Sequence, residues 1–194
     1  MARYDSEHKA ATRRRIIETA GRRLKQDGID GSGVAGLMTD AGLTNGAFYA
    51  HFESKDDLVA NVVADQLATQ CAVLDSLPEG RAALEEFILD YLAPHHRDHP
   101  STGCPSAALL DEIGRCDDAV RDSYTEGMQS IVDVIAAHLS PHDPSAARTR
   151  AVGLFTLLVA TLQLARAVSD PKLSDDILES GIRNAQILLD CGEL

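Results

Sequence analysis

Apolar residues recur at helical spacing along almost the whole chain. In the first segment, Ile16, Ala20 and Leu24 share one helical face and Gly28 follows as a stop signal, which predicts a helix over residues 6–27. The sequence contains no alternating pattern typical of a strand and no internal repeat. The spacing therefore predicts an all-α fold.

Breaker positions divide the rest of the chain. Ser54 and Asp57 form a capping box that opens a helix ending near Ser76, and Pro78 begins the next helix. The polar stretch 94–100 predicts a loop. Short helices are expected at 33–41 and 44–51, and later ones at about 104–115, 118–139, 144–168 and 173–190. The total is about nine helices.

The two short helices, joined by a turn at Gly42, have the size and spacing of a helix-turn-helix. In such a unit the second helix enters the DNA major groove and the first braces it. The apolar set expected to hold both against the first long helix is Val34, Leu37, Met38, Leu43 and Phe48. Thr44 is the expected N-cap of the second short helix, with Asn45, Gly46 and Ala47 as its exposed leading edge.

Charge is distributed unevenly along the chain, whose formal net charge is −12. Residues 1–55 hold nine Lys and Arg against seven Asp and Glu, whereas residues 56–194 hold nine against twenty-three. A basic head on an acidic body predicts a localised anionic partner. The acidic body would repel a DNA duplex everywhere except at the head, so we expect orientation-specific and salt-dependent binding.

The run from Asp40 to Leu58, D-A-G-L-T-N-G-A-F-Y-A-H-F-E-S-K-D-D-L, resembles the signature of the TetR family of bacterial transcriptional regulators, A-G-V-S-x-G-x-x-Y-x-H-F-x-(S/N)-K-x-x-L. The resemblance covers about residues 10–60; beyond them only the length and the helical pattern agree. It implies a three-helix DNA-binding domain over residues 1–55 and a ligand-binding and dimerisation domain over residues 56–194.

The resemblance also implies residue roles. Tyr49 and His51 match phosphate contacts, Lys55 matches a lysine beside the DNA backbone, and Thr44 matches a hydroxyl that caps the helix and contacts phosphate. Asn45 stands where the family has a base-facing residue, and Asn can pair with adenine. The full expected DNA-binding set is Ser32, Val34, Thr44, Asn45, Gly46, Ala47, Tyr49, His51 and Lys55.

One departure from the family pattern affects base reading. The first short helix carries Ala35 and Gly36 where the family usually has an Arg or another polar residue that contacts the groove. Base reading is therefore expected to depend on Asn45 and on the basic arm Arg13–Arg15.

The last two predicted helices each carry an apolar stripe. These stripes are Leu154, Leu158, Thr161, Leu162 and Ala165, and Leu178, Ile182, Ala185 and Leu189. A monomer could bury one such stripe, whereas two predict a four-helix bundle formed with a second copy through helices 144–168 and 173–190. A two-fold homodimer would present two recognition helices to a palindromic site.

The expected function is a repressor released from its operator when a small-molecule effector binds the body and shifts the helix over residues 54–76. The candidate ligand-binding residues, each of which could instead be a core residue, are Phe87, Tyr91, Cys104, Leu109, Tyr124, Met128 and Phe155. The acidic composition of the body favours a cationic ligand or simply a solvated surface.

Three further features of the sequence could indicate other functions. Cys104 at a helix start could make the protein a sensor of oxidants or electrophiles, or could be an inert buried thiol. Gly31–Gly36 fits G-x-G-x-x-G but follows a helix rather than a strand, and His95, His96 and His99 lie in the polar stretch without the Cys pairs of a structural metal site. No catalytic motif, metal site or cofactor is expected. The competing classes of protein are an all-α enzyme and a helical adaptor.

The cysteine spacing and the apolar segments indicate where the protein is located in the cell. The four cysteines show no CxxC spacing, nothing resembles a secretory signal, and the longest apolar run, 151–165, is shorter than a membrane span. We expect a cytoplasmic protein without a membrane partner.

Overall fold

The computed structural model describes residues 2–78 and 80–191, with side chains from residue 7 onward. All the regular elements in these ranges are helical, which confirms the all-α prediction. The nine α-helices are α1 (Ala2–Asp27), α2 (Val34–Asp40), α3 (Lys55–Asp75), α4 (Arg81–Tyr91), α5 (Pro94–Asp98), α6 (Pro105–Ile113), α7 (Asp118–Leu139), α8 (Pro144–Ala167) and α9 (Pro171–Asp190). Two 3-10 helices, η1 (Asn45–Ala50) and η2 (Pro100–Thr102), complete the described chain.

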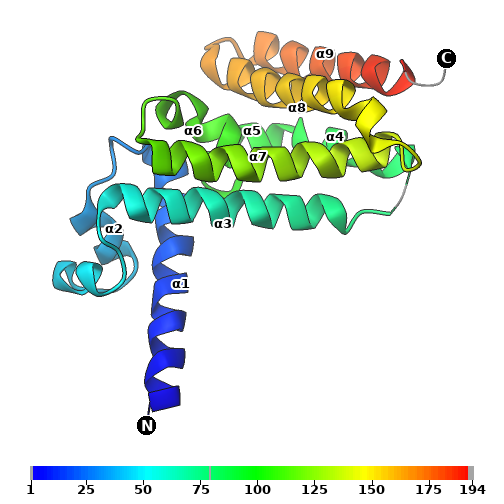
Figure 1. Ribbon diagram of the computed structural model, residues 1–194. Coiled ribbons are helices and arrows are strands. Elements are labelled where there is room, and N and C mark those ends of the chain that lie inside the picture. Colours follow the sequence, from blue (N-terminus) through cyan, green and yellow to red (C-terminus); the bar gives the residue numbers. More distant parts are fainter. Residues whose placement is uncertain (1, 79, 192–194) are drawn as a thin grey trace.

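The N-terminal head consists of α1, α2 and η1. Helix α1 projects from the rest of the molecule, and α2 and η1 lie beside it at one end of α3 (Figure 1). Gly28 follows α1 with φ of 81° and Gly42 makes the turn after α2 with φ of 68°, a region of backbone conformation that favours glycine. Both predicted turns are therefore confirmed.

The second short helix differs from its prediction in detail. It is a 3-10 helix rather than an α-helix, and Thr44 stands at its N-cap without a capping hydrogen bond from its side chain. A segment of six residues with no side-chain cap gains little from an α-helical ladder. The Thr44 hydroxyl is consequently left exposed.

The head has a small apolar core that joins the core of the body. Leu37, Met38 and Phe48 are almost fully buried, while Val34 and Leu43 are partly buried against the same cluster, as predicted. The cluster continues through the buried face of α1 into α3 and the later helices. The described side chains thus form one continuous hydrophobic core.

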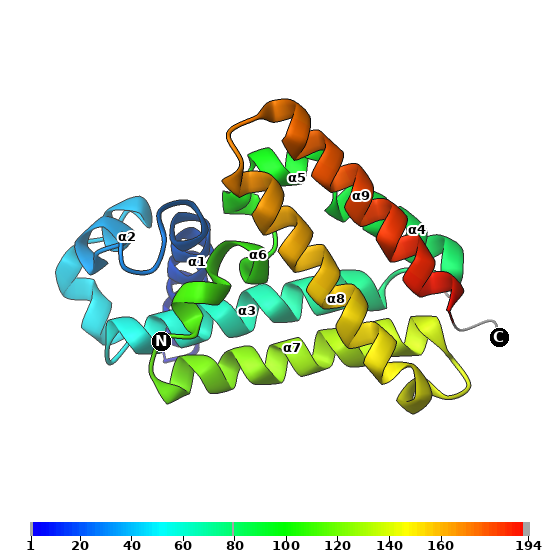
Figure 2. The ribbon, with the colours of Figure 1, turned by 90° about the horizontal axis from the view of Figure 1, so that it is seen from above.

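Helix α3 connects the head to the body. Its capping box is present, because Ser54 Oγ accepts from the Asp57 amide at 3.0 Å and Asp57 Oδ2 accepts from the Glu53 amide at 2.9 Å. Beyond its first turns α3 runs along α7, the most extensive helix pair in the structure, and α8 crosses above them with α9 at its side (Figure 2).

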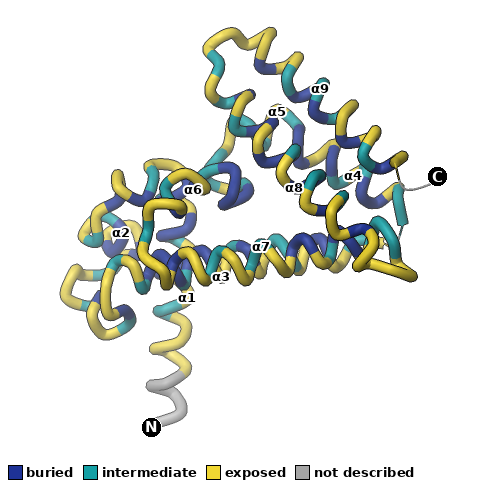
Figure 3. Tube along the Cα trace, turned by 45° about the horizontal axis from the view of Figure 1, so that its top comes forward, coloured by how far each residue is buried: buried dark blue, intermediate teal, exposed yellow. Residues whose placement is uncertain are grey.

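The apolar stripes of α8 and α9, from which the sequence predicted a four-helix bundle with a second copy, are buried within the single chain. Leu154, Leu158 and Leu162 of α8 and Leu178 and Ala185 of α9 are at most 3% exposed within the single chain. Helices α8 and α9 bury these residues against each other and against the body. The exposed apolar side chains of the α8–α9 pair are others, namely Leu164 of α8 and Leu173 and Ile187 of α9, each about half exposed. Buried and exposed positions alternate along both helices (Figure 3).

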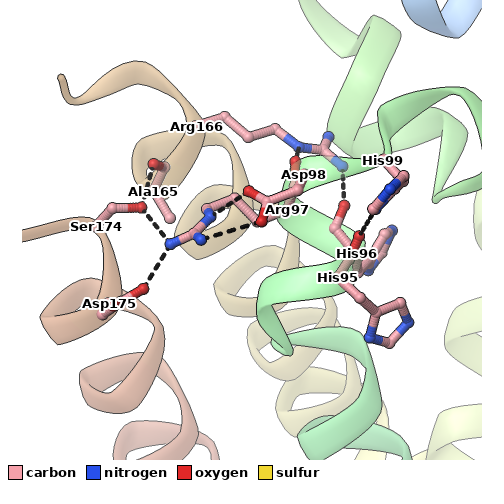
Figure 4. Close-up of polar contacts among 9 residues, drawn as sticks. All are labelled: His95, His96, Arg97, Asp98, His99, Ala165, Arg166, Ser174 and Asp175. Atoms are coloured by element: carbon pink, nitrogen blue, oxygen red, sulfur yellow. Dashed lines mark hydrogen bonds and ion pairs between the residues drawn. The ribbon is translucent and has the colours of Figure 1, made fainter. Parts of the chain in front are cut away.

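The polar stretch 94–100 is not a loop, which corrects the prediction. It forms α5 and the start of η2, and its Arg97 binds side chains near the start of α9, just after α8 ends. Arg97 Nη1 donates to Ser174 Oγ at 2.9 Å and to Asp175 at 2.6 Å (Figure 4). Arg166 of α8 donates back to the carbonyls of His96 and Arg97 at 2.6 and 3.0 Å. These charged side chains, which the sequence suggested would face solvent, instead form hydrogen bonds within the fold.

Helix α8 has the length and hydropathy of a membrane span, the one such helix in the described chain. Its apolar side chains pack against α7 and α9. This packing is that of a core helix.

Candidate functional site

The leading edge of the helix-turn-helix is open to solvent. Thr44, Asn45 and Gly46 are exposed, Ala47 is half-buried, and Tyr49 is 74% exposed. The side chains of Thr44, Asn45 and Tyr49 make no hydrogen bond to any described residue. The Tyr49 ring stands edge-on to the buried ring of Phe48, with 5.2 Å between the centroids, so a core residue sets its direction. Polar groups that are exposed, oriented and unpaired are available to a partner.

The basic arm on α1 is held at one point. Arg13 donates to Asn61 Oδ1 of α3 at 2.8 Å, and its guanidinium lies 4.8 Å from the centroid of the Phe52 ring. Arg14 and Arg15 are exposed beyond it. Of the three arginines, Arg13 ties α1 to α3 while the other two face solvent.

Three of the expected DNA-binding residues have partners inside the head. Ser32 has no exposed surface and its hydroxyl donates to the Gly28 carbonyl at 2.8 Å, so it cannot reach a phosphate. Lys55 is half-buried and donates to the Ile29 carbonyl at 2.5 Å. Val34 packs on the core. His51 is half-buried, and its burial, together with Lys9 and Arg13, lowers the pKa of its imidazole.

A polar cavity of about 290 Å³ lies where α1, α3, α4, α5 and the start of α6 meet. It is lined by Lys25, Gln66, Thr69, Gln70, Val73, Phe87, Asp90, Tyr91, His95, His96, Thr102, Gly103, Cys104 and Pro105. Lys25 donates to Gln66 Oε1 at 2.6 Å and to the Gly103 carbonyl at 2.8 Å. Burial lowers the pKa of its ammonium to about 8.

The wall of this cavity is organised around His96. Its Nε2 accepts from the Cys104 amide at 2.9 Å, so Nδ1 carries the proton and donates to the Tyr91 carbonyl at 2.7 Å. Burial lowers the pKa of His96, in keeping with a neutral ring. His95 and His99 are exposed, and the described residues contain no group of His, Cys, Asp or Glu that could hold a metal ion.

A second cavity of about 250 Å³, between α6, α7 and α8, is almost wholly apolar. Tyr124, Met128 and Phe155 line it, and Tyr124 donates its hydroxyl proton to Ser106 at 3.1 Å. The candidate ligand-binding residues other than Leu109 are therefore divided between the two cavities. Phe87, Tyr91 and Cys104 line the polar cavity instead. Leu109 is buried and lines neither of these two cavities.

Comparison with known proteins finds that residues 16–62 match the sequence model of the bacterial regulatory proteins of the tetR family. Residues 16–62 thus carry the sequence pattern of the TetR family. It is 36% identical over 137 residues to the probable HTH-type transcriptional regulator ArpR of Pseudomonas putida, covering 68% of this chain and 54% of that protein. It is 34% identical over 62 residues to the HTH-type transcriptional regulator AcrR of Shigella flexneri, 32% of this chain and 29% of that protein. The matched part thus spans about half and less than a third of these two TetR-family regulators.

The TetR-family fold extends through the body. The structure of reduced NemR from Escherichia coli superposes with a TM-score of 0.76 at 19% identity, covering 91% of this chain and 96% of that one. The regulator FadR of Bacillus subtilis, solved with stearoyl-CoA, gives a TM-score of 0.62 at 16% identity, over 87% and 96% of the two chains. At these identities the agreement concerns the fold alone.

Two further residues of this chain were missed by sequence reasoning. Glu112 of α6 accepts from the amides of Ile29 and Asp30 at 2.7 and 3.0 Å, so the body holds the turn that precedes α2. No local sequence pattern could predict this contact, because its two sides lie more than eighty residues apart in the chain. Lys25 entered the sequence analysis only as one of the basic residues of the segment 1–55; it is buried because this end of α1 packs against α3 and η2.

Cys104, the candidate sensor, is 5% exposed and donates through its thiol to Gln70 Oε1 at 3.3 Å. Burial makes it less accessible to reagents than an exposed thiol. The sensing role stays a prediction.

Proposed function

We propose that this protein is a DNA-binding transcriptional regulator that binds its operator through the head. The observation that carries the proposal is the exposed, internally unpaired edge formed by Thr44, Asn45 and Tyr49 inside the segment that matches the TetR family. The names of the curated relatives, both HTH-type transcriptional regulators, support it. A cytoplasmic location is part of the proposal, because bacterial DNA lies there.

The head would dock with η1 across the major groove. Asn45 and Gly46 lead toward the base edges, where an Asn side chain can bond both donor and acceptor of adenine. Thr44 and Tyr49 offer hydroxyl groups to phosphates, and Arg14 and Arg15 add cationic charge along α1. Lys55 retains N–H donors beyond its bond to the Ile29 carbonyl, and one of them could bond to a phosphate.

The protein would act as a homodimer that pairs through the outer face of α8 and α9. That face carries Leu164, Leu173 and Ile187, and between the helices lies a groove whose lining includes Ala160, Ile177 and Gly181. Exposed apolar side chains on two adjacent helices are typical of a subunit interface. This face replaces the buried stripes that the sequence indicated.

The body would bind a small-molecule effector that releases the operator, which makes the protein a repressor. The two cavities provide the space for such a ligand, and FadR of B. subtilis was solved with stearoyl-CoA bound. Because α1 and α3 reach from the head into the body, a ligand that favours another arrangement of these helices would lower affinity for DNA.

Selection from a library of random duplexes tests the DNA-binding proposal. The purified protein should enrich one palindromic sequence whose half-sites are about one helical turn apart or a multiple of it. Enrichment of no sequence would contradict the proposal and return attention to an all-α enzyme or an adaptor.

The dimer face is tested by the substitution Leu164→Glu, with Leu89→Glu on α4 as the matched control. Both leucines are about half exposed, but only Leu164 lies on the proposed interface. Light scattering after gel filtration should show a monomer for the first variant and a dimer for the second and for the wild type. Two dimeric variants would exclude this face.

A further inference from the structure

The ammonium of Lys25 is buried without a counter-charge. The side chain is 8% exposed, and its two partners, Gln66 Oε1 and the Gly103 carbonyl, are neutral oxygens. Among the described residues no carboxylate lies within ion-pairing distance of it. An ammonium has three donors, so one N–H is left for a further acceptor. A buried cation without an anionic partner is costly unless a partner arrives from outside.

The hydroxyl of Tyr91 is also without a partner. It is fully buried against the cavity and makes no hydrogen bond of ordinary geometry to the described residues, although the Cys104 thiol lies nearby. Burial holds its pKa well above the usual value, so the group remains a proton donor. An unsatisfied buried donor costs free energy that a ligand acceptor would restore.

The permanent charges nearest to Lys25 have the same sign as its ammonium, whereas the neighbouring Cys104 thiol favours the charged form of the lysine. Arg166, which donates to the carbonyls of His96, Arg97 and Ala107, and Arg22 on α1 both act on Lys25 as like charges. The one carboxylate in the lining is Asp90, whose side chain is 78% exposed at the rim, where it faces His95 at 3.8 Å. The interior is therefore cationic although the body as a whole is acidic.

Part of the lining is apolar. Phe87 and Val73 belong to it, and the Phe87 ring is tilted against the Tyr91 ring, with 5.7 Å between the centroids. The volume of about 290 Å³ lies at the small end of ligand sites. Such a site suits a compact molecule with one anionic end and one apolar end.

We propose that the polar cavity binds a small organic carboxylate, whose oxygens accept from Lys25 and Tyr91 and whose hydrocarbon part packs on Phe87 and Val73. Its regulatory meaning rests on the function proposed above, for which this ligand is the effector. Because Lys25 belongs to α1, the carboxylate would contact a helix of the DNA-binding head directly.

Titration calorimetry with matched probes tests the proposal. The probes are benzoate, phenylacetate, hexanoate and octanoate, each beside its uncharged amide. At least one carboxylate should bind at least about tenfold more tightly than its amide, since the ammonium bonds a charged acceptor more strongly. If no carboxylate binds, or if the amides bind equally well, the proposal is wrong.

Two variants assign the binding to these residues. Lys25→Met should weaken carboxylate binding about 10- to 100-fold, and Tyr91→Phe should weaken it about 3- to 10-fold. Tyr91→Phe should leave the melting temperature of the free protein unchanged or higher, because it removes an unsatisfied hydroxyl. Tyr124→Phe, in the apolar cavity, is the control and should bind like the wild type. Unaltered binding in both Lys25→Met and Tyr91→Phe would overturn the assignment.

A separate titration on selected operator DNA distinguishes the site from its role. If the carboxylate binds and DNA is not released, the site stands and the effector role fails. If DNA is never bound, the proposed function fails while calorimetry still decides the site.

Discussion

The head and the body use their polar side chains in opposite ways. In the head, Asn45 and Tyr49 are exposed and have no partner within the described chain. In the body, Arg97 and Arg166 bond to groups about seventy or more positions away in the sequence, and both ring nitrogens of His96 bond to the backbone. The difference shows where each part acts: the head presents donors and acceptors to a surface outside it, whereas the body uses its own to shape an interior.

The sharpest test of the head separates its core from its surface. Phe48 is 1% exposed and Tyr49 is 74% exposed, although they are adjacent. Phe48→Ala should lower the free energy of unfolding by about 3–5 kcal/mol, because it leaves a cavity in a small core. Tyr49→Ala should change it by less than about 0.5 kcal/mol. Urea denaturation measures both; similar losses would show that Tyr49 is a core residue.

Sequence reasoning could predict the turns and the core of the head because their signals are local. Gly28 and Gly42, the Ser54 capping box and the core residue Phe48 all act within a few positions of themselves. Burial was the part it could not judge: Ser32 is fully enclosed by the turn after α1, and Lys55 bonds to Ile29, twenty-six positions earlier.

The next prediction separates base reading from phosphate contact. Asn45→Ala should cost about 1–3 kcal/mol of binding free energy on the preferred sequence and relax the preference at one base pair. Tyr49→Phe should weaken binding to all duplexes alike. Anisotropy titrations on a set of single-base operator variants measure this, and uniform losses for both variants would mean that Asn45 reads no base.

Glu112 is the point where the body holds the head. Glu112→Ala should lower the free energy of unfolding by about 1–3 kcal/mol, because two backbone amides, of Ile29 and Asp30, lose their acceptor. Glu112→Gln keeps one oxygen and should lose less. Hydrogen exchange should report faster exchange at these two amides in the alanine variant; unchanged protection would exclude the contact.

Lys25 predicts a dependence of stability on pH. Its pKa is about 8 in the folded chain against the ordinary value of 10.5 for a lysine, so between these pH values the unfolded state binds more protons. The contribution of Lys25 to the free energy of unfolding should therefore rise as the pH rises from about 8 to about 10, by an amount on the order of 1 kcal/mol. The difference between wild type and Lys25→Met isolates it, and a flat difference would contradict the buried charge.

The smallest expected effect concerns the cysteines. Cys104 is buried and Cys191 is exposed, so maleimide at neutral pH should label Cys191 about tenfold faster or more, as read by mass spectrometry of the peptides. Equal rates would favour the alternative in which Cys104 senses electrophiles.

The body was less predictable for a physical reason. Helical stripes show which face of a helix is apolar but not what covers it, so the buried faces of α8 and α9 were assigned to a second copy. The residues of α5 look solvated in sequence because their partners, Ser174 and Asp175, lie more than seventy positions away. The cavities could not be predicted either, because each is lined by several helices that are distant in the sequence.

The central claim is that the exposed edge of the head binds specific DNA. Fluorescence anisotropy tests it with a labelled duplex from the region upstream of the protein's own gene and a shuffled duplex of equal composition, at about 50 and 200 mM salt. The account predicts tighter binding to the upstream duplex and a steep loss of affinity at the higher salt. Equal affinity for the two duplexes, or no salt-dependent binding, would contradict it.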